Sequence, residues 1–147
     1  MSTPASRKMF VNLAVRDLKR SVDFFTTLGF TFNPKFTNHE AACMEISENI
    51  FSMLVVRPRF KEFIKETKKS ISDSHKTTEC MLAITCKNKA EVDKMAKTAL
   101  SSGGKPANQL TDLGWMYSWS FQDLDGHIWE PFFMDEKKAP KQAPKKK

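Results

Sequence analysis

Cysteine, glycine and long apolar runs are scarce in this chain. Its three cysteines, Cys43, Cys80 and Cys86, form no C-x-x-C pair and cannot build a complete disulfide framework. No run approaches the ~18 apolar residues that a membrane-spanning helix needs. The first residues are polar and lack the apolar region of a signal peptide. We therefore expect a reduced, cytoplasmic protein that has no contact with a membrane.

Positive charge is concentrated at the C-terminus. The chain has 24 Lys and Arg against 17 Asp and Glu, and its last 13 residues hold six of the lysines against two carboxylates. Because little excess charge remains for the folded part, nucleic acid is not an expected partner. The 40% hydrophobic fraction is sufficient for a core. Residues 135–147 alternate Lys, Ala and Pro, and we predict that they are disordered.

The first half of the chain has the pattern of a βαβββ unit. Residues 9–16 alternate as in a half-buried strand. Asp17 can cap a helix whose apolar positions recur at helical spacing until Gly29 ends it. Three further strands are predicted at residues 30–36, 41–47 and 50–56, followed by a short helix at 57–66.

The second half repeats this order about 70 residues later. Beyond a polar linker at residues 67–78, the pattern predicts a strand at 79–86, a helix at 89–102, and strands at 105–108, 115–121 and 127–134. The predicted modules are therefore residues 8–66 and 79–134. The expected fold class is α+β: tandem βαβββ modules forming a mixed-sheet cup, with the helices outside. Such a cup is a natural ligand site.

Two segments carry a resemblance to a known family. The segments FVNLAVRDLKRSVDFFTTLGF and WSFQDLDGHIWEPFF resemble the glyoxalase / bleomycin-resistance / extradiol-dioxygenase superfamily, also called vicinal oxygen chelate (VOC) proteins. The resemblance covers residues 8–134 and is greatest for its small, glyoxalase-like bacterial branch. It implies paired βαβββ modules, usually in a dimer, around a site that often holds a divalent metal.

The resemblance also implies where metal ligands would lie. They occupy one position on the first strand and one on the last strand of each module, and the matching residues are Phe10, Ser52, Met81 and Glu130. Only Glu130 offers a hard oxygen ligand, whereas metal sites usually use three or more protein ligands. We therefore expect no metal cofactor and a largely eroded site, and a divalent metal is the alternative.

Strand alternation predicts which residues would line the cup. These residues form an apolar surface with a few polar groups, which favours a small organic ligand over a metal centre. They are Phe10, Asn12, Ser52, Met81, Ala83, Thr85, Ile128 and Glu130. Glu130 is either a catalytic general base or a structural carboxylate that pairs with a neighbouring side chain.

Two groups of residues leave further alternatives open. Trp115, Tyr117, Trp119 and Phe121 share one strand face, as either a stacking platform for a planar ligand or core packing. His39, His75 and His127 are interpreted as solvated or turn histidines.

Three functions follow from these observations. The first is a VOC protein, expected as a homodimer, that binds a small organic molecule in its cup. The second is a metal-dependent lyase, similar to lactoylglutathione lyase, or a dioxygenase that uses Glu130. The third is an interaction protein that acts through its Lys-rich tail.

Overall fold

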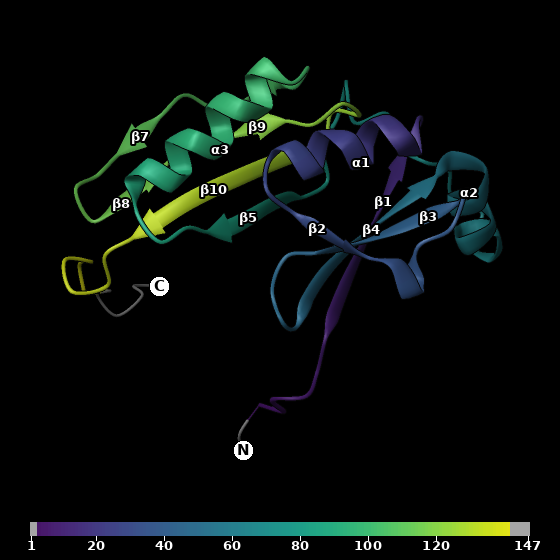
Figure 1. Ribbon diagram of the computed structural model, residues 1–147, viewed down its shortest axis with the longest axis horizontal. Coiled ribbons are helices and arrows are strands. Elements are labelled where there is room, and N and C mark those ends of the chain that lie inside the picture. The colour runs from purple at the N-terminus through teal and green to yellow at the C-terminus, as the bar shows by residue number, and fades with distance from the viewer. Residues whose placement is uncertain (1–2, 142–147) are drawn as a thin grey trace, which may run out of the picture.

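The first module is a four-stranded sheet with one helix packed on it. The computed structural model describes residues 3–141. Strand order in this sheet is β1-β4-β3-β2, with β1 parallel to β4 and the other neighbours antiparallel (Figure 1). The elements are β1 (Met9–Val15), α1 (Leu18–Thr27), β2 (Thr31–Asn33), the 3-10 helix η1 (Pro34–Phe36), β3 (Ala41–Glu45) and β4 (Ile50–Val56).

The second module has the same strand order with two interrupted strands. Parallel β5 and β10 pair as β1 and β4 do, and β8 and β9 lie against β10 in antiparallel register. Helix α2 (Arg57–Ile64), the 3-10 helix η2 (Lys65–Thr67) and a linker, residues 68–80, precede it. Its elements are β5 (Met81–Thr85), α3 (Lys89–Ser101), β6 (Lys105–Pro106), β7 (Thr111–Asp112), β8 (Met116–Ser118), β9 (Phe121–Gln122) and β10 (Ile128–Met134). The α+β class with tandem βαβββ modules is thus confirmed.

Helix α1 begins and ends where local chemistry predicts. The side chain of Asp17 accepts a hydrogen bond from the backbone N–H of Arg20 at 3.1 Å, which satisfies a free donor of the first turn. Gly29 follows the helix at φ +103°, a conformation that other residues adopt only with strain. These two residues fix the length of the helix.

Strand boundaries differ from the predictions at three places. Pro34 has no N–H and opens η1, so β2 ends at Asn33 instead of continuing to Phe36. The strand predicted at 105–108 is shortened to β6, and β7 is a further short strand outside the predicted range. The strand predicted at 115–121 is split into β8 and β9. Between β8 and β9, the hydroxyl of Ser120 accepts a hydrogen bond from the N–H of Asn108 at 2.7 Å. A side-chain oxygen thus takes the place of a backbone carbonyl as the acceptor.

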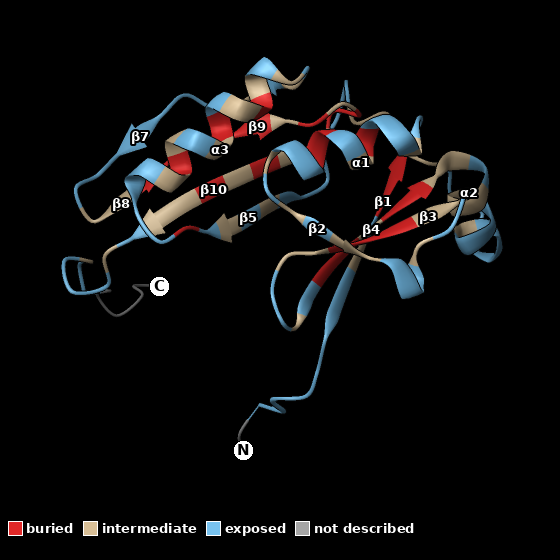
Figure 2. Ribbon diagram, in the orientation of Figure 1, coloured by how far each residue is buried: buried red, intermediate tan, exposed pale blue. Residues whose placement is uncertain are grey.

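Both modules contribute to a common hydrophobic core beneath α1 and α3. Phe24 and Phe25 of α1 pack in one cluster with Phe121 and Trp129 of the second module. The rings of Phe25 and Trp129 are 5.1 Å apart, and Trp129 is fully buried. Figure 2 shows the buried residues along the sides of the helices and strands that face each other. Each sheet therefore packs one face on the core and turns the other, here called its open face, away from α1 and α3.

The C-terminal segment of the described chain begins with a turn. Residues Asp135–Ala139 form a turn, in which the N–H of Ala139 donates to the carbonyl oxygen of Asp135 at 3.0 Å, so the predicted disorder does not begin at Asp135. Residues 142–147 of the Lys-rich tail lie outside the described residues. Within residues 3–141, no helix is both long and apolar enough to cross a membrane.

Candidate functional site

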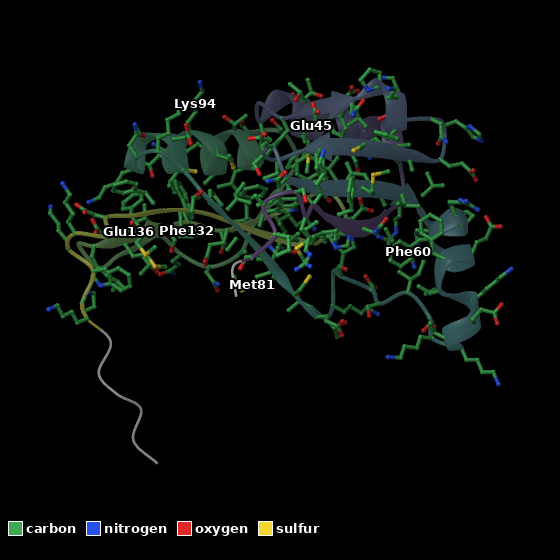
Figure 3. All side chains as sticks on the ribbon, turned by 90° about the horizontal axis from the view of Figure 1, so that it is seen from below. Glu45, Phe60, Met81, Lys94, Phe132 and Glu136 are labelled. Atoms are coloured by element: carbon green, nitrogen blue, oxygen red, sulfur yellow. The ribbon has the colours of Figure 1, made fainter. Side chains whose placement is uncertain are left out.

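The open face of the second module carries four of the predicted cup residues in one block. Met81 lies in register with Ile128, and Ala83 with Glu130. In-register neighbours on parallel strands point to the same side of a sheet, so these four side chains share the open face. Met81 is 45% exposed, and Glu130 is partly exposed beside it. In Figure 3, which views the molecule from below, Met81 and Phe132 are labelled on these strands. Thr85, the next residue with the same alternation, is also exposed.

Phe10 and Asn12 occupy the corresponding face of the first module. Phe10 stacks on Phe51 with ring centroids 4.6 Å apart and still leaves 45% of its surface exposed. Asn12 is exposed and in register with Met53. This open face is therefore as apolar as predicted, with one amide on it.

The predicted position of Ser52 is wrong by one residue. Ser52 is in register with Val11, whose side chain packs on the core, and it is fully buried. The residue that corresponds to Glu130 is Met53, in register with Asn12 as Glu130 is with Ala83. Because side chains alternate along a strand, a one-residue error moves Ser52 to the opposite face. Its hydroxyl has no hydrogen-bond partner among the described residues.

The structure decides between the two interpretations of the aromatic strand. The hydroxyl of Tyr117 donates to Asp93 of α3 at 2.6 Å, and Phe121 is fully buried against Trp129 and Phe24. This face therefore packs on the helices at Tyr117 and Phe121, and these two side chains are core residues. A stacking platform for a ligand on this face is excluded for Tyr117 and Phe121.

A cavity of about 320 Å³ lies between the two modules, beneath the linker. Asn12, Leu13 and Ala14 of β1 line it from the first module, His127 from the second, and Cys80 from the end of the linker. Its volume is at the small end of the ~300–1,000 Å³ typical of ligand sites. Of the predicted cup residues, only Asn12 lines this cavity; the remaining seven do not.

Helix α2 and the linker complete the wall of the cavity. Phe60 and Ile64 of α2 contribute apolar surface, and the linker contributes Ile71 together with several hydroxyl side chains. Figure 3 shows Phe60 on the side of α2 that is turned toward the rest of the molecule. Sequence periodicity does not reveal the linker part of this wall, because the linker has no apolar residues at helical or strand spacing.

The linker is held in place by contacts to both modules. Arg16, which follows β1, bridges Asp73 of the linker at 3.9 Å and Asp125 of the second module at 3.6 Å. An added Cβ on Gly126 would lie 2.7 Å from the backbone carbonyl of Ser74, so the linker backbone touches this glycine. The cavity wall is thus part of the packed structure.

The motif residues around Asp125 connect the modules. The carboxylate of Asp125 accepts hydrogen bonds from the N–H of Arg16 at 2.9 Å and from the hydroxyl of Ser21 at 3.3 Å. His127 Nε2 lies 2.8 Å from the carbonyl oxygen of Ala14, and because a carbonyl only accepts, this nitrogen donates. The D-x-D-G-H sequence therefore joins the second module to the end of β1.

A buried carboxylate supports the same turn. Asp123 accepts from the backbone N–H of Asp125 and of His127, and from the indole N–H of Trp129 at 3.0 Å. Burial raises the pKa of Asp123, because removal from water disfavours the charged form. These roles of Asp123 and His127 were not predicted from the sequence, although the spacing of Asp-x-Asp-Gly is a turn signal.

The metal positions implied by the resemblance do not fit a divalent ion. Phe10, Met81 and the structural counterpart Met53 offer no hard oxygen or nitrogen donor, and Glu130 is a single carboxylate. Within residues 3–141, no three His, Cys, Asp or Glu side chains are grouped so that they could hold a metal ion. We therefore derive no chemistry through a metal.

The metal content of the protein is the direct test of this donor set. After incubation with Zn²⁺, Ni²⁺, Mn²⁺ or Fe²⁺ and desalting, we expect well below one ion per chain, because one carboxylate binds such ions weakly. Elemental analysis of the wild-type protein and of Glu130→Ala measures this. One ion per chain that disappears in Glu130→Ala would contradict the eroded site.

Comparison with solved structures identifies the class of fold. A hypothetical protein from S. aureus matches with 24% identity and a TM-score of 0.72, over 90% of this chain and 95% of that chain. A glyoxalase/bleomycin resistance protein/dioxygenase family enzyme from Burkholderia phytofirmans PsJN matches with 12% identity and a TM-score of 0.71, over 85% and 96%. A glyoxalase-related enzyme from Fulvimarina pelagi has 20% identity and a TM-score of 0.71, over 87% and 88%. The chain thus has the VOC fold.

A family model matches the N-terminal part of the chain. Residues 7–47 match the family described as bleomycin resistance protein-like N-terminal. This segment covers β1 through β3 and includes the first of the two motifs that carry the predicted resemblance. The resemblance to the VOC superfamily is thereby confirmed. No curated protein matches the chain.

Proposed function

We propose that this protein binds a small organic molecule between its two modules, without the metal that many VOC proteins use. The cavity lined by both modules is the observation that carries this proposal, because ligand sites favour concave surfaces between structural units. Its mixed lining, with apolar Leu13 and Phe60 and the amide of Asn12, suits an organic molecule. Glu130 lies outside the cavity lining, so we assign it no catalytic step.

The exposed apolar residues of the open faces support a homodimer, which we propose is cytoplasmic. Phe10 and Met81 are each 45% exposed, although large apolar side chains favour burial. A second copy is the occupant we propose for this surface, and it would shield the open faces. The three free cysteines are consistent with a reducing compartment.

Blocking the cavity tests the proposed function. We expect Asn12→Trp to reduce the affinity of any cavity ligand at least tenfold, because an indole at this exposed position would occupy the space of the ligand. Ligands are first found by thermal-shift screening of the wild-type protein, and their dissociation constants are then measured by calorimetry for both proteins.

The control places the same side chain elsewhere. Asn108→Trp adds an indole at an exposed residue that does not line the cavity, and should leave affinity unchanged. Equal affinity of wild type and Asn12→Trp for every ligand found would exclude this cavity as the site.

A further inference from the structure

The charges around the cavity limit the ligands that it can select. Its described lining residues include one lysine, Lys69, and one carboxylate, Glu79, and both side chains are exposed. His127 also lines the cavity, but its Nε2 is engaged by the carbonyl oxygen of Ala14. Exposed charges of opposite sign largely cancel and are screened by salt. The lining thus offers no net attraction for an anion or a cation.

Hydroxyl groups dominate the polar part of the lining. Thr67 and Thr78 donate to the carbonyl oxygens of Ile64 and Cys80, at 2.6 and 3.0 Å, so their protons are in use. Ser70, Ser72 and Ser74 recur at every second residue of the linker, and no hydrogen bond of their hydroxyls is found within residues 3–141. Each free hydroxyl can both donate to and accept from a ligand.

Apolar surface lies on the other walls of the same cavity. It comes from Leu13 and Ala14 of β1 and from Phe60 and Ile64 of α2. A ligand that fills the cavity therefore meets apolar groups of β1 and α2, and it meets the hydroxyl groups of the linker together with Ile71.

We propose that the cavity selects an uncharged molecule with an apolar face and several hydroxyl groups along one edge, as in a small aryl glycoside. This inference rests on the proposed function and adds the ligand class to it. A hydroxyl-rich edge exchanges hydrogen bonds with Ser70, Ser72 and Ser74. A strongly charged ligand would lose hydration without gaining a buried partner of opposite charge.

Three probes with the same aromatic ring test the ligand class. Phenyl β-D-glucopyranoside is neutral and hydroxylated, phenyl phosphate is an anion, and benzylamine is a cation at neutral pH. Calorimetric titration of the full chain should give the glucoside an affinity at least tenfold higher than that of either charged probe. Tighter binding of a charged probe, or binding of none of the three, overturns the inference.

A linker variant tests the role of the serines. In S70A/S72A/S74A, each lost hydrogen bond should weaken glucoside binding about 2- to 10-fold. The control S47A/S101A removes two exposed hydroxyls outside the cavity lining and should bind as wild type does. An unchanged affinity in the triple variant, with native circular dichroism, overturns the inference.

The two proposals fail in different ways. If phenyl phosphate or benzylamine binds more tightly than the glucoside and Asn12→Trp abolishes that binding, the cavity remains the site and only the ligand class is wrong. If the glucoside binds equally well to wild type and Asn12→Trp, both the cavity and the ligand class are wrong.

Discussion

Trp129→Ala is expected to lower the free energy of unfolding by about 3–5 kcal/mol, the range typical of large aromatic deletions in cores. Trp129 is fully buried and lies against both Phe25 and Phe30, at ring distances of 5.1 and 6.4 Å. Its removal leaves a cavity where α1 of the first module packs on β10 of the second. Because both modules share this cluster, we expect the whole protein to unfold in one cooperative transition at a lower urea concentration. Urea denaturation followed by circular dichroism measures this.

Two further variants separate the causes of this loss. Trp129→Phe keeps most of the ring but removes the indole N–H from the buried carboxylate of Asp123, so we expect a loss of about 1–3 kcal/mol. Trp115→Ala removes a half-buried tryptophan that belongs to neither core cluster, and should cost about 1 kcal/mol or less. Equal losses for Trp115→Ala and Trp129→Ala would contradict the shared core.

Gly126→Ala is expected to destabilise the protein and release the linker. Gly126 has φ +88°, and an added Cβ would lie 2.7 Å from the carbonyl carbon and oxygen of Ser74 and 2.8 Å from the amide nitrogen of His75. These are backbone atoms and cannot rotate away. We expect a loss of about 2–5 kcal/mol, the sum of conformational strain and overpacking. Faster tryptic cleavage at Lys76 should accompany it.

Gly29→Ala is the matched control for this variant. Gly29 has a similar φ of +103°, but an added Cβ would meet nothing within 4 Å. Its substitution therefore measures the conformational strain alone, about 1–2 kcal/mol, and should leave cleavage at Lys76 unchanged. If both glycine variants lost the same stability and were cleaved equally fast, the contact between the linker and Gly126 would contribute nothing.

The amino-acid sequence by itself determined the order of elements and most of their faces. Strand alternation and helical spacing depend on backbone geometry that is the same in every protein, and they identified β1, α1, β4, β5, α3 and β10. Asp17 and Gly29 bounded α1 for the same local reason. Seven of the eight predicted cup residues accordingly lie on open faces, although their role in binding stays a prediction.

Only the tertiary structure decided what depends on partners distant in sequence. The register of β4 against β1 placed Ser52 in the core, because pairing, and not alternation alone, fixes which face meets the helices. The bond from Tyr117 to Asp93 decided the face of the aromatic strand. The cavity beneath the linker arises from contacts of Arg16 and Gly126 with a segment that has no apolar periodicity, and such contacts leave no local signal in the sequence.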